Sequence, residues 1–237
     1  MTDNPSVCYR HPSRESWVLC QRCGKTICGE CQIPAAVGVH CPDCVKEARS
    51  ESKPVRAARR RMVFTGRTPG TIGLLVAIGI VFVLDMVSGN ALTDWLAFYS
   101  PLLFAEPWRV LTYGLVHSGI MHVVLNGYSI WILGTIVERT MGTRNFLVVF
   151  AVSTITGALA VAWLAPGSIV VGASAGIFGL FSALFILNRG FGGSNVSLLV
   201  IVGINLAIGF IVPGISWQAH VGGLLGGAAM TALLRRR

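Results

Sequence analysis

The chain has 237 residues, of which 53% are hydrophobic and 12% are charged, whereas a soluble domain usually carries about 25% charged residues. From Thr68 to Leu234 only eight residues are acidic or strongly basic, so the composition excludes a single soluble domain. It indicates a small polar head followed by a long apolar body. The net charge of +9 does not favour nucleic-acid binding, because the basic residues gather at 46–67 and 235–237, where they flank apolar segments.

The polar head, residues 1–45, holds all seven cysteines of the chain in four pairs of ligands, each pair separated by two residues. Such pairs let two side chains of a tight turn reach one metal ion, and eight ligands complete two closed tetrahedral sites. The predicted ligands are Cys8, His11, Cys20, Cys23, Cys28, Cys31, Cys41 and Cys44. We therefore predict two structural Zn²⁺ ions, which supply much of the folding energy of a head too short to bury a large core.

A disulfide framework is the alternative interpretation of the head. Seven cysteines are an odd number, and the head is expected to lie in the cytoplasm, where thiols stay reduced. His40 could also replace one ligand, although the cysteines and His11 already complete the count.

Residues 46–69 follow as a basic linker, either helical or flexible, whose Arg59–Arg61 run could contact anionic lipid headgroups. Residues 70–237 then contain six apolar stretches near the length of about 20 residues that a membrane-spanning helix needs. These stretches are Gly70–Val87, Ile120–Val137, Phe146–Leu164, Ile169–Leu187, Val196–Val212 and Ile215–Leu234. The sequence therefore predicts an all-α polytopic membrane protein with six spans.

The basic residues between the predicted spans set the orientation. With the amino terminus in the cytoplasm, the loop with Arg139 and Arg144, the loop with Arg189 and the terminal arginines all lie on the cytoplasmic side, as the positive-inside rule requires. The segment 88–119 is rich in large aromatic residues, which favour the membrane interface, and it is predicted to be a partly embedded outer loop. We expect a multi-pass protein of the cell membrane with both termini cytoplasmic.

Polar residues of three predicted spans fall at a similar depth on the outer side. Ser174 lies about five residues into the fourth span, roughly 8 Å below its outer edge, and His220 lies equally deep in the sixth. His117, His122 and Asn126 occupy the outer half of the second span. Polar groups inside a membrane are costly, so their common depth indicates a functional site.

These side chains have the chemistry of a serine hydrolase. Ser174 would act as nucleophile and His220 as its base, with His122, Asn126 and the Ser174 N–H stabilising the oxyanion. The spans with the serine and the histidine contain no acidic residue, so a dyad is expected. Alone, Ser174 or His220 would more often be structural. A metal site of His117, His122 and His220 is a rival interpretation that lacks a nearby fourth ligand.

Taken in order, the motifs of the body resemble the rhomboid family of intramembrane serine proteases over residues 70–234. The matching elements are Trp108-Arg109, the spacing of His117, His122 and Asn126, the turn from Gly134 to Arg144, Gly172-Ala173-Ser174, and Ala219-His220 followed by Gly223. The family commonly has glycine directly after the nucleophile, where this chain has Ala175.

The resemblance implies a six-helix core with a short central fourth span, transmembrane protein substrates cut in or near their membrane segment, and no cofactor for catalysis. It implies His122 and Asn126 as oxyanion residues, with His117, Trp108 and Arg109 in supporting roles. The head resembles B-box-like zinc modules. That resemblance implies that the pairs alternate, so that the first and third pairs share one ion and the second and fourth share the other.

Two other functions compete with a protease. A catalytically inactive rhomboid-like membrane binding protein would capture transmembrane clients without cutting them, but the chain keeps both Ser174 and His220. A transporter would show internal repeats or paired charges in broken helices, which the sequence does not clearly contain. The expected partners are transmembrane substrates and the lipid bilayer, and the head could bind a cytoplasmic protein, gate activity or stabilise the amino terminus.

Overall fold

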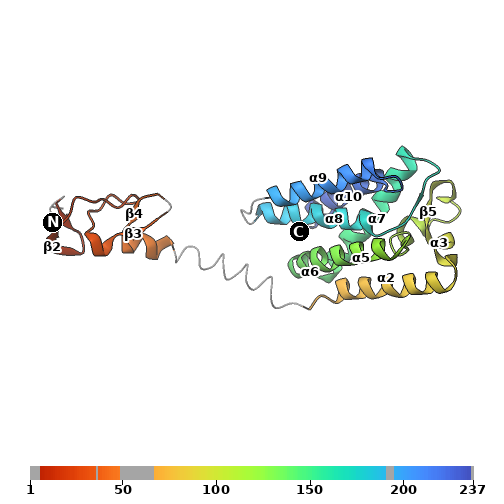
Figure 1. The fold of residues 1–237 in the computed structure, drawn as a ribbon, viewed down its shortest axis with the longest axis horizontal. Helices are drawn as coiled ribbons and strands as arrows, with labels where there is room; N and C mark the ends of the chain where they lie inside the picture. The colour runs from red at the N-terminus through yellow and green to blue at the C-terminus, as the bar shows by residue number, and fades with distance from the viewer. Residues whose placement is uncertain (1–5, 36, 49–66, 191–194, 236–237) are drawn as a thin grey trace. The chain divides into compact units, whose positions relative to one another are not determined.

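The computed structural model describes residues 6–35, 37–48, 67–190 and 195–235, and the chain divides into two compact units, Met1–Thr65 and Gly66–Arg237 (Figure 1). The predicted linker, residues 46–69, lies for the most part outside the described residues.

The head is built from short antiparallel pairs of strands. Strand β1 (Val7–Cys8) pairs with β2 (His11–Glu15), and β3 (Ile33–Pro34) pairs with β4 (Val39–His40). A 3-10 turn, η1 (Gly29–Cys31), and a helical segment at residues 42–48 complete it. Its buried cluster consists of Ile27 and six of the cysteines, so sulfur atoms replace the usual aliphatic core.

The body is an all-α bundle, as the sequence predicts. Its long helices are α2 (Pro69–Val87), α5 (Ile120–Ser129), which continues through the π-helical η3 (Ile130–Gly134) into α6 (Thr135–Met141), α7 (Thr143–Leu164), α8 (Ser174–Gly190), α9 (Val196–Ile211) and α10 (Trp217–Arg235). Figure 1 shows the long helices side by side, with α3 and β5 at one end of the bundle.

Within the part of the chain that the structure describes, three helical segments are long and apolar enough to cross a membrane: Pro69–Val87, Ile120–Met141 and Thr143–Leu164. The described part of α8, Ser174–Asn188, and α9 are apolar but shorter. The surfaces of α2, α5 and α9 fit a lipid environment, because many of their large apolar side chains are exposed. The fold class predicted from the sequence is confirmed.

The segment between α2 and α5 is ordered by short elements. It contains α3 (Ala91–Leu96), β5 (Phe98–Tyr99), the 3-10 turn η2 (Ser100–Leu102) and α4 (Arg109–Thr112). Strand β5 pairs antiparallel with β6 (Ile169–Val170), so this segment is joined to the chain that leads into α8.

The predicted start of the fourth span at Ile169 was wrong. Residues Ile169–Val170 are extended because they pair with β5, and Gly172 has a φ of +110°, which an L side chain rarely adopts. The helix therefore begins at Ser174, so this residue occupies the first position of α8 and not a position five residues inside a helix.

Candidate active site and metal centres

Ser174 and His220 lie in hydrogen-bond contact, although 46 positions separate them in the chain. The Nε2 atom of His220 is 3.0 Å from the Oγ atom of Ser174, a distance at which the ring nitrogen can accept the serine proton. Ser174 begins α8, and His220 lies in the first turn of α10. The structure thus brings together the two residues that the sequence predicts as a pair.

Small residues allow the helices that carry this pair to approach each other and α7. A methyl group on Gly223 of α10 would collide with the carbonyl oxygen of Ala175, and one on Gly227 would collide with the backbone of Gly179. On the other side, Gly222 lies against the Thr156 carbonyl of α7. Close backbone packing at small residues is the usual way in which helices associate in membranes.

The imidazole of His220 is held by stacking and not by an acidic residue. The ring of Phe178, one turn after Ser174, stacks on it with centroids 4.3 Å apart and planes inclined by 15°. His220 is buried, and among the described residues none accepts a hydrogen bond from its Nδ1 atom.

Two of the polar residues near α5, His117 and His122, lie beside the chain just before Ser174. The N–H of Ala173 lies 3.4 Å from Nε2 of His117, and the rings of His117 and His122 are in edge contact at 4.9 Å. A methyl group on Gly172 would lie 2.5 Å from Nε2 of His122, so only glycine leaves room for this ring. Both histidines therefore adjoin the loop that precedes Ser174, and His117 lies before α5 and not within it.

Asn126 is buried, but its side chain is engaged within its own helix. Its Nδ2 atom donates to the carbonyl oxygen of His122 at 2.9 Å, which uses one of its two N–H bonds. The second N–H of the amide remains for another acceptor.

The predicted supporting residues Trp108 and Arg109 order the segment between α2 and α5. The guanidinium of Arg109 pairs with Glu106 and donates to the Ala97 carbonyl at 2.8 Å, while the indole N–H of Trp108 donates to the Trp95 carbonyl at 3.3 Å. Both residues therefore make contacts within this segment, and none of these contacts reaches Ser174 or His220.

Tyr113, which directly follows α4, connects that segment to the active-site loop. Its carbonyl oxygen accepts the N–H of Gly172 at 2.9 Å, and its hydroxyl donates to the Thr154 carbonyl of α7 at 2.8 Å. Sequence analysis missed Tyr113 and Phe178. The signal for Phe178 was its spacing of four from Ser174, which places both on one face of a helix, whereas no local pattern marks Tyr113.

Ala175, which stands where the rhomboid family commonly has glycine, is accommodated by a glycine opposite. Its side chain is fully buried, and a methyl group on Gly157 of α7 would lie only 2.6 Å from the Ala175 Cβ. The space that the alanine methyl needs is therefore the space that Gly157 leaves free.

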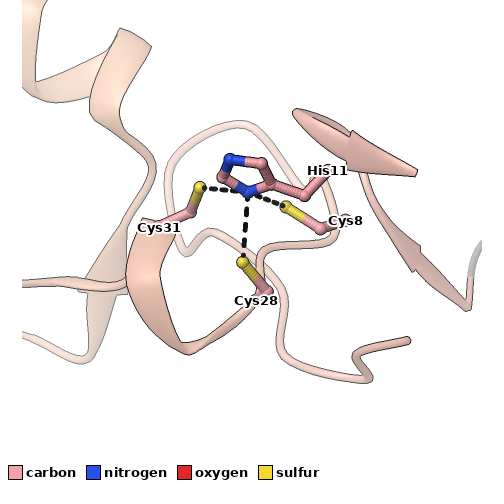
Figure 2. A group of neighbouring side chains, drawn as sticks. All are labelled: Cys8, His11, Cys28 and Cys31. Carbon is pink, nitrogen blue, oxygen red and sulfur yellow. Dashed lines mark hydrogen bonds between the residues drawn. The ribbon is translucent and has the colours of Figure 1, made fainter. Parts of the chain in front are cut away.

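The ligand pairs of the head form two separate groups that could each hold a metal ion. One group is Cys8, His11, Cys28 and Cys31 (Figure 2), and the other is Cys20, Cys23, Cys41 and Cys44; within each, the ligand atoms lie within 4.8 Å of one another. This is the alternating pairing that the resemblance implies, and His40 belongs to neither group.

The distances inside these groups fit a tetrahedral ion. The Nδ1 atom of His11 lies 3.3 Å from the Cys28 sulfur, 3.5 Å from the Cys31 sulfur and 3.8 Å from the Cys8 sulfur. Bonds of about 2.0–2.3 Å to one ion separate tetrahedral ligands by about 3.3–3.8 Å. Backbone N–H groups also point at sulfur, since Cys41 donates to the Cys20 sulfur at 3.1 Å.

The cysteine thiols of the head differ in pKa, and a bound cation would favour the thiolate form of all of them. Burial raises the pKa of Cys8, but N–H groups of Cys28, Arg10 and His11 donate to its sulfur and bring the pKa down to about 6. Burial and the neighbouring sulfurs of Cys8 and Cys28 raise the pKa of Cys31 to about 11. A bare group thus opposes full ionisation, whereas a divalent ion stabilises all of its thiolates.

Comparisons with known proteins agree with this architecture. The family model described as the Rhomboid domain matches residues 105–237, more than half of the chain. The chain is 35% identical over 186 residues to "Rhomboid protease GluP" of Bacillus subtilis (strain 168), covering 73% of this chain and 36% of that protein. It is 28% identical over 170 residues to "Rhomboid protease GlpG" of Pectobacterium atrosepticum, covering 68% of this chain and 61% of that protein.

A third relative is "RHOMBOID-like protein 6, mitochondrial" of Arabidopsis thaliana, which is 34% identical over 136 residues, or 54% of this chain and 44% of that protein. The chain therefore spans less than half the length of two of these relatives. The relatives named as proteases support intramembrane proteolysis at the level of the family. The chain belongs to the rhomboid family of multi-pass membrane proteins.

Proposed function

We propose that this protein is an intramembrane serine endopeptidase that cleaves transmembrane proteins with a Ser174–His220 dyad. The observation that carries the proposal is the 3.0 Å contact between Ser174 Oγ and His220 Nε2 at the start of two closely packed helices. The positions of His117 and His122 beside the loop that precedes Ser174 support it.

The reaction follows from this geometry. Ser174 Oγ attacks the carbonyl carbon of the scissile peptide while Nε2 of His220 takes its proton, and the resulting imidazolium then protonates the leaving amine. Water, activated by the same nitrogen, releases the acyl group from the serine. The stacked ring of Phe178 keeps the imidazole in place during both proton transfers.

The oxyanion that forms in each attack needs donors. The Ser174 N–H at the first position of α8 has no partner within the helix, because the first four N–H groups of a helix are free. The ring of His122 and the remaining N–H of Asn126 are the side-chain donors that we assign to this role.

The head would hold two structural Zn²⁺ ions, since four soft ligands per group and no open position suit zinc. We also propose that both termini lie in the cytoplasm, because the basic loops then follow the positive-inside rule. The head would in that case be available to a cytoplasmic protein partner.

The proposal is tested by incubating purified protein in lipid vesicles with a reporter that carries one transmembrane segment. The wild type should cut the reporter and Ser174→Ala should not. Ser182→Ala is the matched control, because Ser182 also lies on α8 but its hydroxyl donates to the Gly179 carbonyl at 2.8 Å. Binding of several such segments without cleavage by the wild type would instead support a client-binding protein.

A further inference from the structure

The Nδ1 side of His220 is the unexplained part of the active site. For Nε2 to accept the serine proton, the single proton of the neutral ring must sit on Nδ1. That atom is buried and has no acceptor among the described residues. Buried N–H groups without partners are rare, so whatever covers this one is of functional interest.

Gly209 of α9 covers it. A methyl group on this glycine would lie 3.5 Å from His220 Nδ1 and 3.3 Å from the Cβ atom of Trp217. All residues of α9 are described, and Gly209 alone among them is buried. Gly209 is therefore the one buried position of α9, and because it has no side chain the backbone of α9 faces the histidine there.

A second contact holds α9 at this place. The ring of Phe210 stacks on the ring of Trp217 with centroids 4.7 Å apart and planes inclined by 23°. Trp217 begins α10, one turn before His220. The stacked pair thus fixes Gly209 relative to the imidazole.

We propose that Gly209 is a positioning residue for His220: its bare backbone closes the Nδ1 side of the imidazole and holds the ring between Phe178 and Ser174. The proposal rests on the proposed function, since it assigns the geometry of the same dyad. A methyl group at position 209 would already be in van der Waals contact with Nδ1, so the proposal implies that a larger side chain there displaces either α9 or the ring, and that water then reaches Nδ1.

The test is a series of variants at Gly209 with a matched series at Gly203, which lies on the same helix with no described atom within 4 Å of an added methyl. Gly209→Val should lower kcat by about 10²-fold and leave KM nearly unchanged, because a misplacement near 1 Å costs about that much. Gly209→Ala should leave kcat close to the wild-type value, because its methyl group would lie in ordinary van der Waals contact with Nδ1. Gly209→Ser should recover part of the loss, since its hydroxyl can accept from Nδ1. Gly203→Val should match the wild type.

Wild-type kcat in Gly209→Val, or an equal loss in Gly203→Val, would overturn the proposal. A readout that needs no activity separates it from the proposed function: nitrogen-15 NMR of histidine-labelled protein, with the His220 signal assigned by its loss in His220→Gln. The Nδ1 proton should exchange slowly with water in the wild type and quickly in Gly209→Val. Slow exchange in both the wild type and Gly209→Val would refute the proposal that Gly209 shields Nδ1. If the wild type does not cleave the reporter but the two proteins still differ in exchange rate, only the proposed protease function would be refuted.

Discussion

The hydrogen bonds that Glu138 accepts predict how much its substitution should lower the free energy of unfolding. Its carboxylate is buried and accepts the N–H of Gly70 at 2.8 Å, the N–H and hydroxyl of Thr71 at 2.7 Å each, and the hydroxyl of Thr143 at 2.7 Å. One side chain of α6 therefore binds the first turn of α2 and the start of α7.

Glu138→Gln keeps the shape but replaces one acceptor oxygen by an NH₂ group. Each oxygen accepts one backbone N–H and one hydroxyl; the hydroxyl can turn and accept from the NH₂ group, so one backbone N–H is left without a partner. A buried unpaired group costs about 1–3 kcal/mol, so the free energy of unfolding should fall by about that amount. For a chain of this size, 1 kcal/mol corresponds to about 2–4 °C, so Tm should fall by at least about 2 °C.

The assay is thermal unfolding in detergent, followed by circular dichroism, with Thr71→Val as the second arm of a double-mutant cycle. The two substitutions should cost less together than the sum of their separate costs, because each removes the same bonds. Additive effects, or a change below about 1 kcal/mol for Glu138→Gln, would show that the four bonds do not stabilise the fold as a unit.

The other predictions concern the dyad, the oxyanion, the metal and the packing. His220→Ala should abolish cleavage of the reporter while Tm stays close to the wild-type value; retained cleavage would eliminate the dyad. Asn126→Ala should lower kcat by about 10²–10³-fold without abolishing it, as loss of one oxyanion donor does, and unchanged kcat would exclude that role. Metal analysis of purified protein should give two Zn²⁺ per chain, and a chelator should unfold the head; a folded, metal-free head would contradict the assignment. Gly157→Ala should destabilise by about 1–3 kcal/mol through overpacking. Ala175→Gly should restore only part of the loss in the double variant, because the added methyl would also lie 2.9 Å from the Ala219 carbonyl oxygen and the Tyr113 hydroxyl; full additivity of the two changes would contradict the contact between positions 157 and 175.

Most of the body could be predicted because hydropathy reports directly on helices that face lipid. The predicted spans agree with α2, α7 and the continuous segment Ile120–Met141 to within a few residues. The prediction failed at Ile169, since hydropathy cannot distinguish an apolar strand from the apolar start of a helix. The strand is formed by pairing with Phe98–Tyr99, a contact between distant segments that no local pattern encodes.

The two groups of candidate metal ligands in the head could be predicted from the spacing of cysteines and His11 and not from hydropathy. Ligand spacing is local, and the number of ligands fixes the number of closed sites, so all eight ligands could be named from the sequence. Their pairing is not local: the alternate order brings Cys8 next to Cys28 and Cys20 next to Cys41. Only the resemblance to B-box-like modules implied it.

The position of Ser174 depends on residues far from any catalytic motif. The serine begins a helix, and the loop before it is fixed at Gly172, whose N–H is bound by Tyr113 and whose Cα lies against His122. Tyr113 in turn follows the short helix that Arg109 anchors to the Ala97 carbonyl. The segment between α2 and α5 therefore fixes the loop in front of Ser174, and if Ser174 is the nucleophile, a change in that segment should alter cleavage without contacting the serine. Trp108 and Arg109 belong to this argument because their contacts order the segment that binds the loop.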